Sequence, residues 1–148
     1  MALVKRQFEL GRQAIFKDVE ELDPVLLDVQ LEGWSNTIRW QLGHLLVAAE
    51  SFLFGGNGQL PVEYNDWFGY GSRPSEWKSD VPSADVIIHQ LKEQLERIKG
   101  IPVDRFEEKL EQPVLGNNTY GELVYFTAYH ELNHAGQIHL MARLVNKK

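Results

Sequence analysis

Three of the five histidines of this chain lie close together near its end, at positions 130, 134 and 139. Because an α-helix turns by about 100° per residue, His130 and His134 project from one face of a helix, whereas His139 lies on another side. The apolar residues that recur at helical spacing in this segment lie on the same face as His130 and His134. Two of these imidazoles are therefore predicted to point inward, one turn apart, which is a spacing that suits a shared metal ion.

The same stretch fits the H-E-x-x-H pattern of zinc proteases through His130, Glu131 and His134. In the extended metzincin form, a glycine and a histidine follow the second motif histidine by three and six residues. Here Gly136 and His139 follow His134 by two and five residues, and no strand is predicted upstream. A zinc hydrolase is therefore kept only as a remote alternative. Glu131, about 100° around the helix from His130, is expected to be a solvated or rim carboxylate.

The remaining two histidines lie in other predicted helices. The charged line of the second helix runs through Arg39 and Glu50, and His44 lies off that line, so its side chain is expected to face a neighbouring helix. His89 shares a polar helix face with Glu93 and is expected at the surface. One further inward-facing histidine is therefore available to the pair on the last helix.

A buried imidazole needs a partner, because an unsatisfied buried polar group costs about 1–3 kcal/mol. For a single core histidine the ordinary partner is a buried carbonyl or hydroxyl, such as that of Thr127 or Ser51. For His44, His130 and His134 together, a shared divalent ion is the better interpretation. Three neutral ligands leave the charge of the ion uncancelled and at least one coordination position open. Zinc, nickel, iron and copper all suit such a ligand set.

Helical periodicity and its breakers predict the elements that position these residues. The first helix ends at Asp23-Pro24, and the second starts after Ser35 or Asn36 as N-cap and stops at Gly55. The third runs from Ser83 to Gly100, and the fourth begins with a capping box at 119–122 and continues almost to the end. Residues 103–111 suggest one or two further turns, and "GNN" at 116–118 is interpreted as a loop. No strand pair is predicted, and residues 1–148 are expected to form one all-α domain, a four-helix bundle.

The connection between the second and third helices, residues 55–82, is rich in glycine and aromatic residues. It has too many breakers for regular structure and too many aromatics for an idle linker, so a partly ordered functional loop is expected. The loop aromatics are expected to wall the mouth of the site, with capping of the open bundle end as the competing interpretation: Tyr64, Trp67, Phe68, Tyr70 and Trp77.

The amino-acid composition limits the classes of partner that this protein is expected to bind. The 148 residues carry 21 acidic and 15 basic side chains, a net charge of −6, with no basic cluster of the kind that binds nucleic acid. The chain has no cysteine, which excludes disulfides, thiolate ligands and a cysteine nucleophile, and favours the cytoplasm. The longest apolar stretch, at 42–54, is interrupted by His44 and Glu50 and is too short to span a bilayer, so no membrane partner is expected.

The string "WQLGHLL" at 40–46, together with His130 and "HAGQI" at 134–138, resembles the DinB/YfiT-like superfamily over essentially the whole chain. The resemblance implies an up-down-down-up four-helix bundle with one divalent metal ion held by His44, His130 and His134. The acid at 131 is not part of the shared pattern. Gln137, one turn beyond His134, is a candidate for orienting a ligand, with a helix-packing amide as the alternative.

Relatives implied by this resemblance include bacillithiol S-transferases and mycothiol-dependent maleylpyruvate isomerase. The resulting hypothesis is a metal-dependent transferase that activates a low-molecular-weight, bacillithiol-like thiol for attack on a small electrophile. The alternative is a non-catalytic metal- or ligand-binding bundle of the stress response, favoured by the lack of an inward-facing acid or base beyond the histidines. The wide apolar circumference of the second helix suggests a homodimer.

Overall fold

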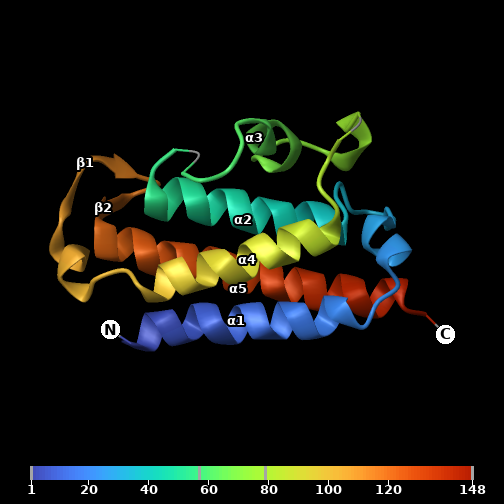
Figure 1. Ribbon diagram of the computed structural model, residues 1–148, viewed down its shortest axis with the longest axis horizontal. Coiled ribbons are helices and arrows are strands. Elements are labelled where there is room, and N and C mark those ends of the chain that lie inside the picture. Colours follow the sequence, from blue (N-terminus) through green and yellow to red (C-terminus); the bar gives the residue numbers. More distant parts are fainter. Residues whose placement is uncertain (1, 57, 79, 148) are drawn as a thin grey trace.

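The structure, a computed structural model, describes residues 2–56, 58–78 and 80–147, and this part of the chain is mostly helical (Figure 1). The five α-helices of the described part are α1 (Ala2–Glu20), α2 (Ile38–Phe54), α3 (Glu63–Phe68), α4 (Ala84–Lys99) and α5 (Tyr120–Val145). Short 3-10 helices span Pro24–Asp28, Pro74–Glu76 and Val103–Glu107, and two strands, β1 (Lys109–Val114) and β2 (Asn117–Thr119), pair antiparallel.

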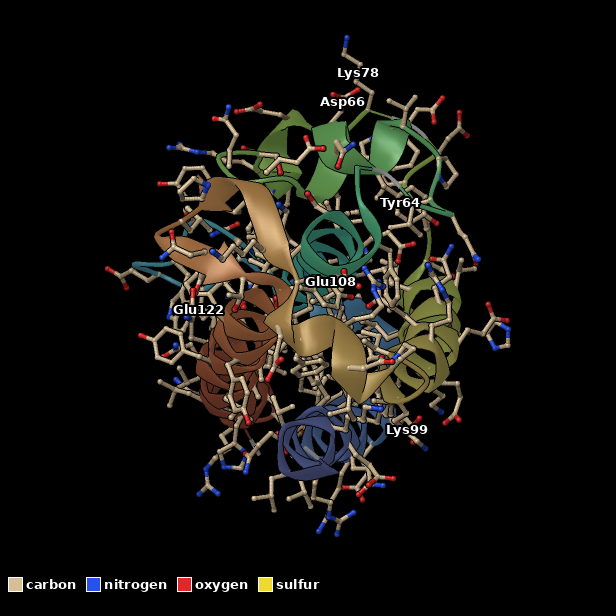
Figure 2. The ribbon with its side chains drawn as sticks, turned by 90° about the vertical axis from the view of Figure 1, so that its left-hand side faces the viewer. Tyr64, Asp66, Lys78, Lys99, Glu108 and Glu122 are labelled. Carbon is tan, nitrogen blue, oxygen red and sulfur yellow. The ribbon has the colours of Figure 1, made fainter. Side chains whose placement is uncertain are left out.

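The four long helices lie side by side, with α1 against α4 and α5, and α2 against the same two helices (Figure 1). Seen from the end that carries the strands, α3 lies outside α2, on the side away from α1 (Figure 2). The predicted helix starts at Ser83 and Thr119 are confirmed, with both residues as N-caps, and so is the capping box between Thr119 and Glu122. For α2, the cap is Thr37 instead of Ser35 or Asn36, and its Oγ1 accepts a hydrogen bond from the backbone N–H of Trp40 at 3.3 Å.

The prediction that no strands form was wrong. Residues 103–107 do form a helical turn, but Lys109–Val114 forms β1, and "GNN" contributes the end of the turn and the start of β2. Leu115 and Gly116 connect the strands with φ of 49° and 82°, the two positive values that a two-residue type I′ turn needs. The usual Asn-Gly sequence of this turn is missing, because leucine occupies the first turn position. Both strands are also too exposed to show the alternation of apolar and polar residues that predicts a strand.

The long connection also contains more regular structure than predicted, because its residues 63–68 form α3. This helix approaches α2 closely at Gly43, where a Cβ atom would lie 2.2 Å from a ring carbon of Phe68. Phe68 is fully buried there. Glycine at this position therefore lets α3 pack directly on α2, immediately beside His44.

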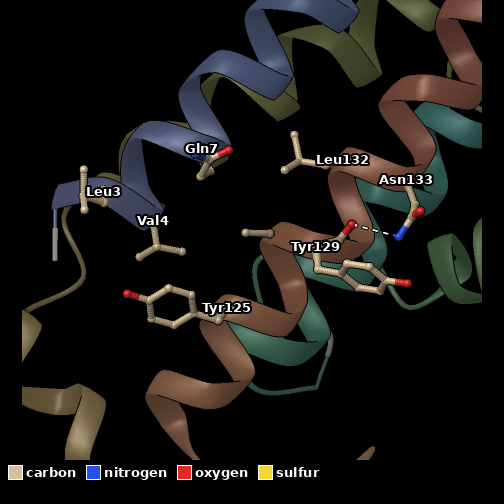
Figure 3. A pocket seen from close by; sticks show the side chains of 8 residues that line it. Leu3, Val4, Gln7, Tyr125, Tyr129, Leu132 and Asn133 are labelled. Atoms are coloured by element: carbon tan, nitrogen blue, oxygen red, sulfur yellow. Dashed lines mark hydrogen bonds between the residues drawn. The ribbon is translucent and has the colours of Figure 1, made fainter.

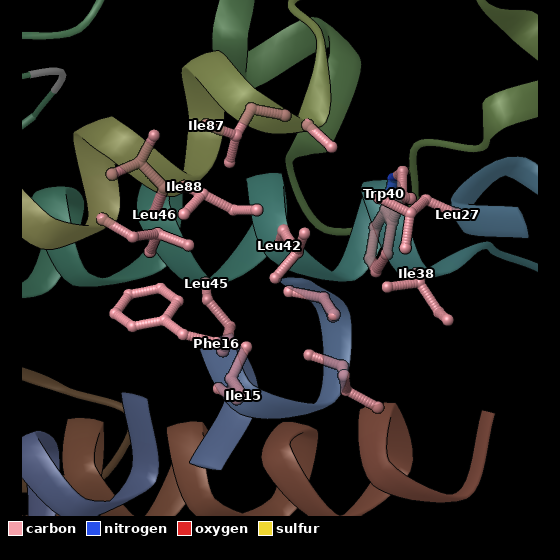
Figure 4. Packing of buried hydrophobic residues seen from close by; sticks show 14 of the residues in the cluster. Ile15, Phe16, Leu27, Ile38, Trp40, Leu42, Leu45, Leu46, Ile87 and Ile88 are labelled. Carbon is pink, nitrogen blue, oxygen red and sulfur yellow. The ribbon is translucent and has the colours of Figure 1, made fainter. Parts of the chain in front are cut away.

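The core is built around α2, whose side chains interdigitate with those of α1 and α4 (Figure 4). Leu42 and Leu45 have no exposed surface. Because α3, α4 and α5 all contact α2, its wide apolar circumference is covered within one chain. The apolar surface of α2 therefore gives no support to a homodimer, which stays a prediction.

The interior also holds a network of charged and amide groups that the sequence analysis missed. Glu131 is 2% exposed and pairs with Arg12, which has no exposed surface, so the prediction of a rim carboxylate was wrong. Arg12 also donates to the carbonyl of Leu91 and to the side chain of Gln94, both at 2.7 Å. Glu131, which lies about 100° around α5 from His130, therefore faces Arg12 of α1 and not solvent.

The network continues to Glu50 on α2. The Glu50 carboxylate accepts hydrogen bonds from Gln94 Nε2 at 2.7 Å, from Arg97 at 2.8 Å and from the backbone N–H of Gln59 at 2.9 Å. Glu50 is buried, so the predicted exposed charged line on this helix was wrong at this residue. Arg39, the other end of that line, is only partly buried and pairs with Asp28 at 2.8 Å.

Among the described residues, no helix is both long enough and apolar enough to cross a lipid bilayer.

Candidate metal centre

His44 on α2 and His130 and His134 on α5 come together between the two helices. One potential ligand nitrogen from each histidine lies within 4.8 Å of the other two. Their ring centroids are 4.6 to 5.2 Å apart. The predicted convergence of three imidazoles from two distant parts of the sequence is therefore present in the structure.

His44 is held in place by its neighbours on α2 and α3. Its Nδ1 lies 2.9 Å from the carbonyl oxygen of Phe68, so this nitrogen carries a proton and donates it. The ring of Trp40 stacks on the imidazole with centroids 4.7 Å apart and planes 10° from parallel. A proton on Nδ1 leaves the lone pair of Nε2 free to bind a metal.

His134 is oriented by an amide that the sequence analysis missed. Its Nδ1 donates to Oε1 of Gln41, a fully buried side chain on α2. The amide nitrogen of Gln41 donates in turn to Asn36 Oδ1 at 3.1 Å and to Gln137 Oε1 at 2.9 Å. Gln137 thus reaches His134 only through Gln41, and its role in orienting a ligand stays a prediction. The sequence did contain a signal for this role of Gln41, because this residue lies three positions before His44 and therefore on the same face of the helix.

His130 has the least satisfied environment. Its Nδ1 is buried and is the only buried side-chain nitrogen or oxygen without a hydrogen-bond partner among the described residues. The rings of Phe52 and Phe126 lie against it, with centroids 6.3 and 6.5 Å away. Such an unpartnered nitrogen costs about 1–3 kcal/mol, and a cation bound to it would supply the missing partner.

His44 does have a backbone carbonyl as partner, but the two hydroxyl groups considered for the histidines are otherwise engaged or exposed. The hydroxyl of Thr127 donates to the carbonyl of Leu123 at 2.7 Å, within its own helix. Ser51 is exposed at the surface of α2. Hydrogen bonding to these hydroxyl groups therefore does not explain why three imidazoles gather here.

Burial keeps the three imidazoles neutral. Desolvation, together with the neighbouring rings of the cluster, lowers the pKa of His130 to about 4 and that of His134 to about 3. Desolvation also lowers the pKa of His44, opposed by its hydrogen bond to Phe68. Neutral imidazole is the form that binds metal, so at neutral pH the cluster is ready to bind without losing protons.

The other two histidines lie apart from the cluster, as predicted. His89 pairs with Glu93 at 2.8 Å, and both side chains are exposed. His139 lies 3.1 Å from Asp18 on α1. The glutamate of the H-E-x-x-H pattern, Glu131, faces Arg12, whereas a zinc protease needs it at the metal as general base. This geometry argues against the hydrolase alternative.

The loop aromatics pack mainly on one another. Tyr64 donates a hydrogen bond to Gln90 at 3.0 Å, and Trp77 donates from Nε1 to the carbonyl of Trp67 at 2.9 Å. Tyr70 is 99% exposed. The ring contacts of the three histidines are instead made with Trp40, Phe52 and Phe126. The role of Tyr64, Trp67 and Trp77 as a substrate wall stays a prediction.

Two larger hollows lie along α5, but neither is lined by a histidine of the cluster. One, of about 510 Å³, runs between the start of α1 and the middle of α5 (Figure 3) and is lined by Leu3, Val4, Gln7, Tyr125, Ala128, Tyr129, Leu132 and Asn133. The other, of about 610 Å³, lies toward β2 and is lined by Phe106, Asn117, Gly121, Glu122, Tyr125, Phe126 and Tyr129. Phe126 joins this second hollow to the ring of His130.

Comparison with known families shows that the model of the DinB superfamily matches residues 7–138. This range contains His44, His130 and His134, and also Gln41. Comparison with curated proteins gives no match.

Proposed function

Because the chain belongs to the DinB superfamily, we propose that His44, His130 and His134 bind one divalent metal ion and that this site activates a low-molecular-weight thiol. The observation that carries the proposal is the gathering of three neutral imidazoles, each with one potential ligand nitrogen within 4.8 Å of the other two. The same membership supports an up-down-down-up arrangement of α1, α2, α4 and α5.

The donor set fits a divalent cation. Nε2 of His44 and Nε2 of His134 are left free by the hydrogen bonds of their Nδ1 atoms, and His130 has a buried nitrogen in need of a partner. Zinc, nickel, iron and copper all accept imidazole nitrogen, so the ligands do not select among them. When bound, the ion supplies a positive charge that favours the thiolate over the protonated thiol.

The remaining chemistry follows from the surroundings. The chain has no cysteine, so the sulfur must come from a cosubstrate. In the transfer, the thiol gives its proton to solvent, its sulfur bonds to the electrophilic carbon, and the bond from that carbon to its leaving group breaks. Trp40, Phe52 and Phe126 surround the histidines with apolar rings, which exclude water and suit a small apolar electrophile. We place this reaction in the cytoplasm, where such thiols are kept reduced.

A second candidate function is a metal- or ligand-binding bundle that performs no chemistry, of the kind used in a stress response. The observation that favours it is the engagement of the nearest acid. Glu131 is held by Arg12, and no other carboxylate belongs to the histidine cluster among the described residues. A thiol proton would therefore have to leave without help from a general base of the protein.

Metal analysis and a transfer assay test both functions. The metal content of the purified protein is compared with that of His44→Ala, His130→Ala and His134→Ala, with His89→Ala as the control on an exposed histidine. We expect one metal ion per chain, lost in the three cluster variants and kept in the control. Metal retained in all three cluster variants would refute the site.

The metal-loaded protein is then assayed with 1-chloro-2,4-dinitrobenzene as model electrophile and with cysteine, coenzyme A and bacillithiol in turn. Turnover that depends on the metal and disappears in His44→Ala is the expected result for the transferase. Tight metal binding without turnover for any of the thiols would contradict the transferase and favour the binding protein.

A further inference from the structure

We propose that Gln41 is the positioning residue of this metal site: its neutral carboxamide fixes the proton of His134 on Nδ1 and thereby presents Nε2 to the cation. This inference rests on the proposed metal binding by the three histidines. It goes beyond that binding because it assigns the orientation of one ligand, and the charge left on the ion, to a residue outside the ligand set.

The hydrogen bonds of Gln41 define the orientation of its amide in this structure, together with the orientations of the Asn36 and Gln137 amides. Its two N–H groups are used by two oxygen acceptors, Asn36 Oδ1 at 3.1 Å and Gln137 Oε1 at 2.9 Å. Turning the amide over would place its oxygen against those two oxygens and its N–H groups against His134. The oxygen of Gln41 therefore faces Nδ1 of His134 as an acceptor, and an acceptor there requires that Nδ1 carry the proton.

Gln41 is also the only side chain, among the described residues, that forms a hydrogen bond to a histidine of the cluster. The Nδ1 proton of His44 goes to a backbone carbonyl, which no substitution removes, and Nδ1 of His130 has no partner. Gln41 lies on α2 and His134 on α5, so their hydrogen bond also joins the two helices that supply the ligands. A single substitution at Gln41 therefore removes the orientation of His134 selectively.

The neutrality of this side chain has a chemical consequence. A carboxylate at the same place would make the imidazole a stronger donor and would cancel part of the charge of the ion. An amide orients the ring without adding negative charge, so the full positive charge stays available at the open position. Glutamine at this position favours thiolate formation at some cost in metal affinity.

The test uses three variants. Gln41→Leu removes the acceptor and Gln41→Glu replaces it with a charged one. Gln94→Leu is the matched control, because Gln94 is an equally buried glutamine whose bonds go to Leu46, Glu50 and Arg12 and not to a histidine. Each metal-free protein is examined by nitrogen-15 NMR of the imidazoles, with the His134 signal assigned by its loss in His134→Ala. Zinc affinity is measured by competition with a chelator.

In the wild type we expect His134 to be protonated on Nδ1 alone. In Gln41→Leu we expect a mixture of both tautomers and a zinc affinity lower by about 10- to 100-fold. In Gln41→Glu we expect tighter zinc binding with slower thiol transfer. Gln94→Leu is expected to lower the melting temperature while leaving the His134 signal and the zinc affinity unchanged.

A wild-type tautomer and affinity in Gln41→Leu would overturn the proposal, and so would an equal loss of affinity in Gln94→Leu. If Gln41→Leu does not fold, Gln137→Ala takes its place, because it frees one N–H of Gln41 at a half-buried position and is expected to weaken the Nδ1 preference. The tautomer of His134 is read without metal or thiol. A protein that keeps the tautomer but performs no transfer would refute the proposed activity and leave the positioning role intact.

Discussion

The neutrality of the buried histidines predicts how many protons leave when metal binds. An imidazole with the ordinary pKa of 6.5 is about 76% protonated at pH 6, so three such ligands would together release about 2.3 protons per metal ion. Burial lowers the pKa of His130 to about 4 and of His134 to about 3, and both are already neutral at pH 6. The pKa of His44 is also lowered by burial, so this residue carries less than the proton fraction of about 0.76 that an ordinary imidazole holds at pH 6. The expected release is therefore below about 0.8 protons.

Isothermal titration calorimetry of zinc binding at pH 6, in buffers of different ionisation enthalpy, measures this number directly. Zinc affinity should change with pH for the same reason. If the three histidines had ordinary pKa values, the zinc affinity would fall on the order of 10⁴-fold between pH 7 and pH 5. If only His44 takes up a proton in this range, the zinc affinity should fall by at most about 25-fold. His89→Ala serves as control because that histidine is exposed and distant from the cluster. A release of two or more protons at pH 6 would refute the conclusion that the cluster is desolvated.

The lowered pKa values of His130 and His134 also determine how the stability of the metal-free protein changes with pH. Between about pH 4 and pH 6.5 the unfolded chain binds protons that folded His130 and His134 do not bind. The metal-free protein is therefore most stable above pH 6.5 and loses stability as the pH falls through this range. Denaturant midpoints measured at pH 7, 6 and 5 should decrease in that order.

Three further predictions concern the framework. Glu131→Gln leaves Arg12 buried without its counter-ion and should lower the free energy of unfolding in urea by about 3–5 kcal/mol. Metal-dependent thiol transfer should be retained in the protein that stays folded, and its loss there would contradict a purely structural role of Glu131. Gly43→Ala forces Phe68 away from α2 and should lower the free energy of unfolding by about 1–3 kcal/mol, and an unchanged value would contradict the close packing. Leu115→Asn should stabilise the hairpin by about 1 kcal/mol, because asparagine tolerates the positive φ, and a lower melting temperature would refute this turn type.

Periodicity and capping residues were enough to predict the four long helices and the inward direction of three histidines. The signals are local: apolar residues recur at helical spacing, and Ser83 and Thr119 accept hydrogen bonds from backbone groups only three residues away. His44, His130 and His134 could be grouped because a pair one turn apart on one helix restricts where a third ligand must lie. The hairpin was not predicted because leucine occupies the first position of its turn, and no neighbouring residue indicates that φ of Leu115 is positive.

The buried charges could not be predicted in this way, because their compensation is not local. Glu131 and Arg12 are 119 positions apart in the sequence, and Glu50 and Gln94 are 44 apart. A helical projection assigns an isolated acid to solvent, since burying it alone costs several kcal/mol. Only the packed arrangement of α1, α2, α4 and α5 shows that each acid has a buried donor opposite it.

The packing of α3 on α2 connects the fold to the proposed chemistry. Gly43 has no side chain, so Phe68 can lie directly against α2, and this contact brings the Phe68 carbonyl to within 2.9 Å of Nδ1 of His44. A larger residue at position 43 would move that carbonyl and release the ring of His44 from its orientation. On the other side of the cluster, Gln41 holds His134 by a hydrogen bond of the same kind. Gln41 and Gly43 are two residues apart in the string "WQLGH", and they lie three residues and one residue before His44. They thus orient two different histidines of the proposed metal site, in addition to packing in the core.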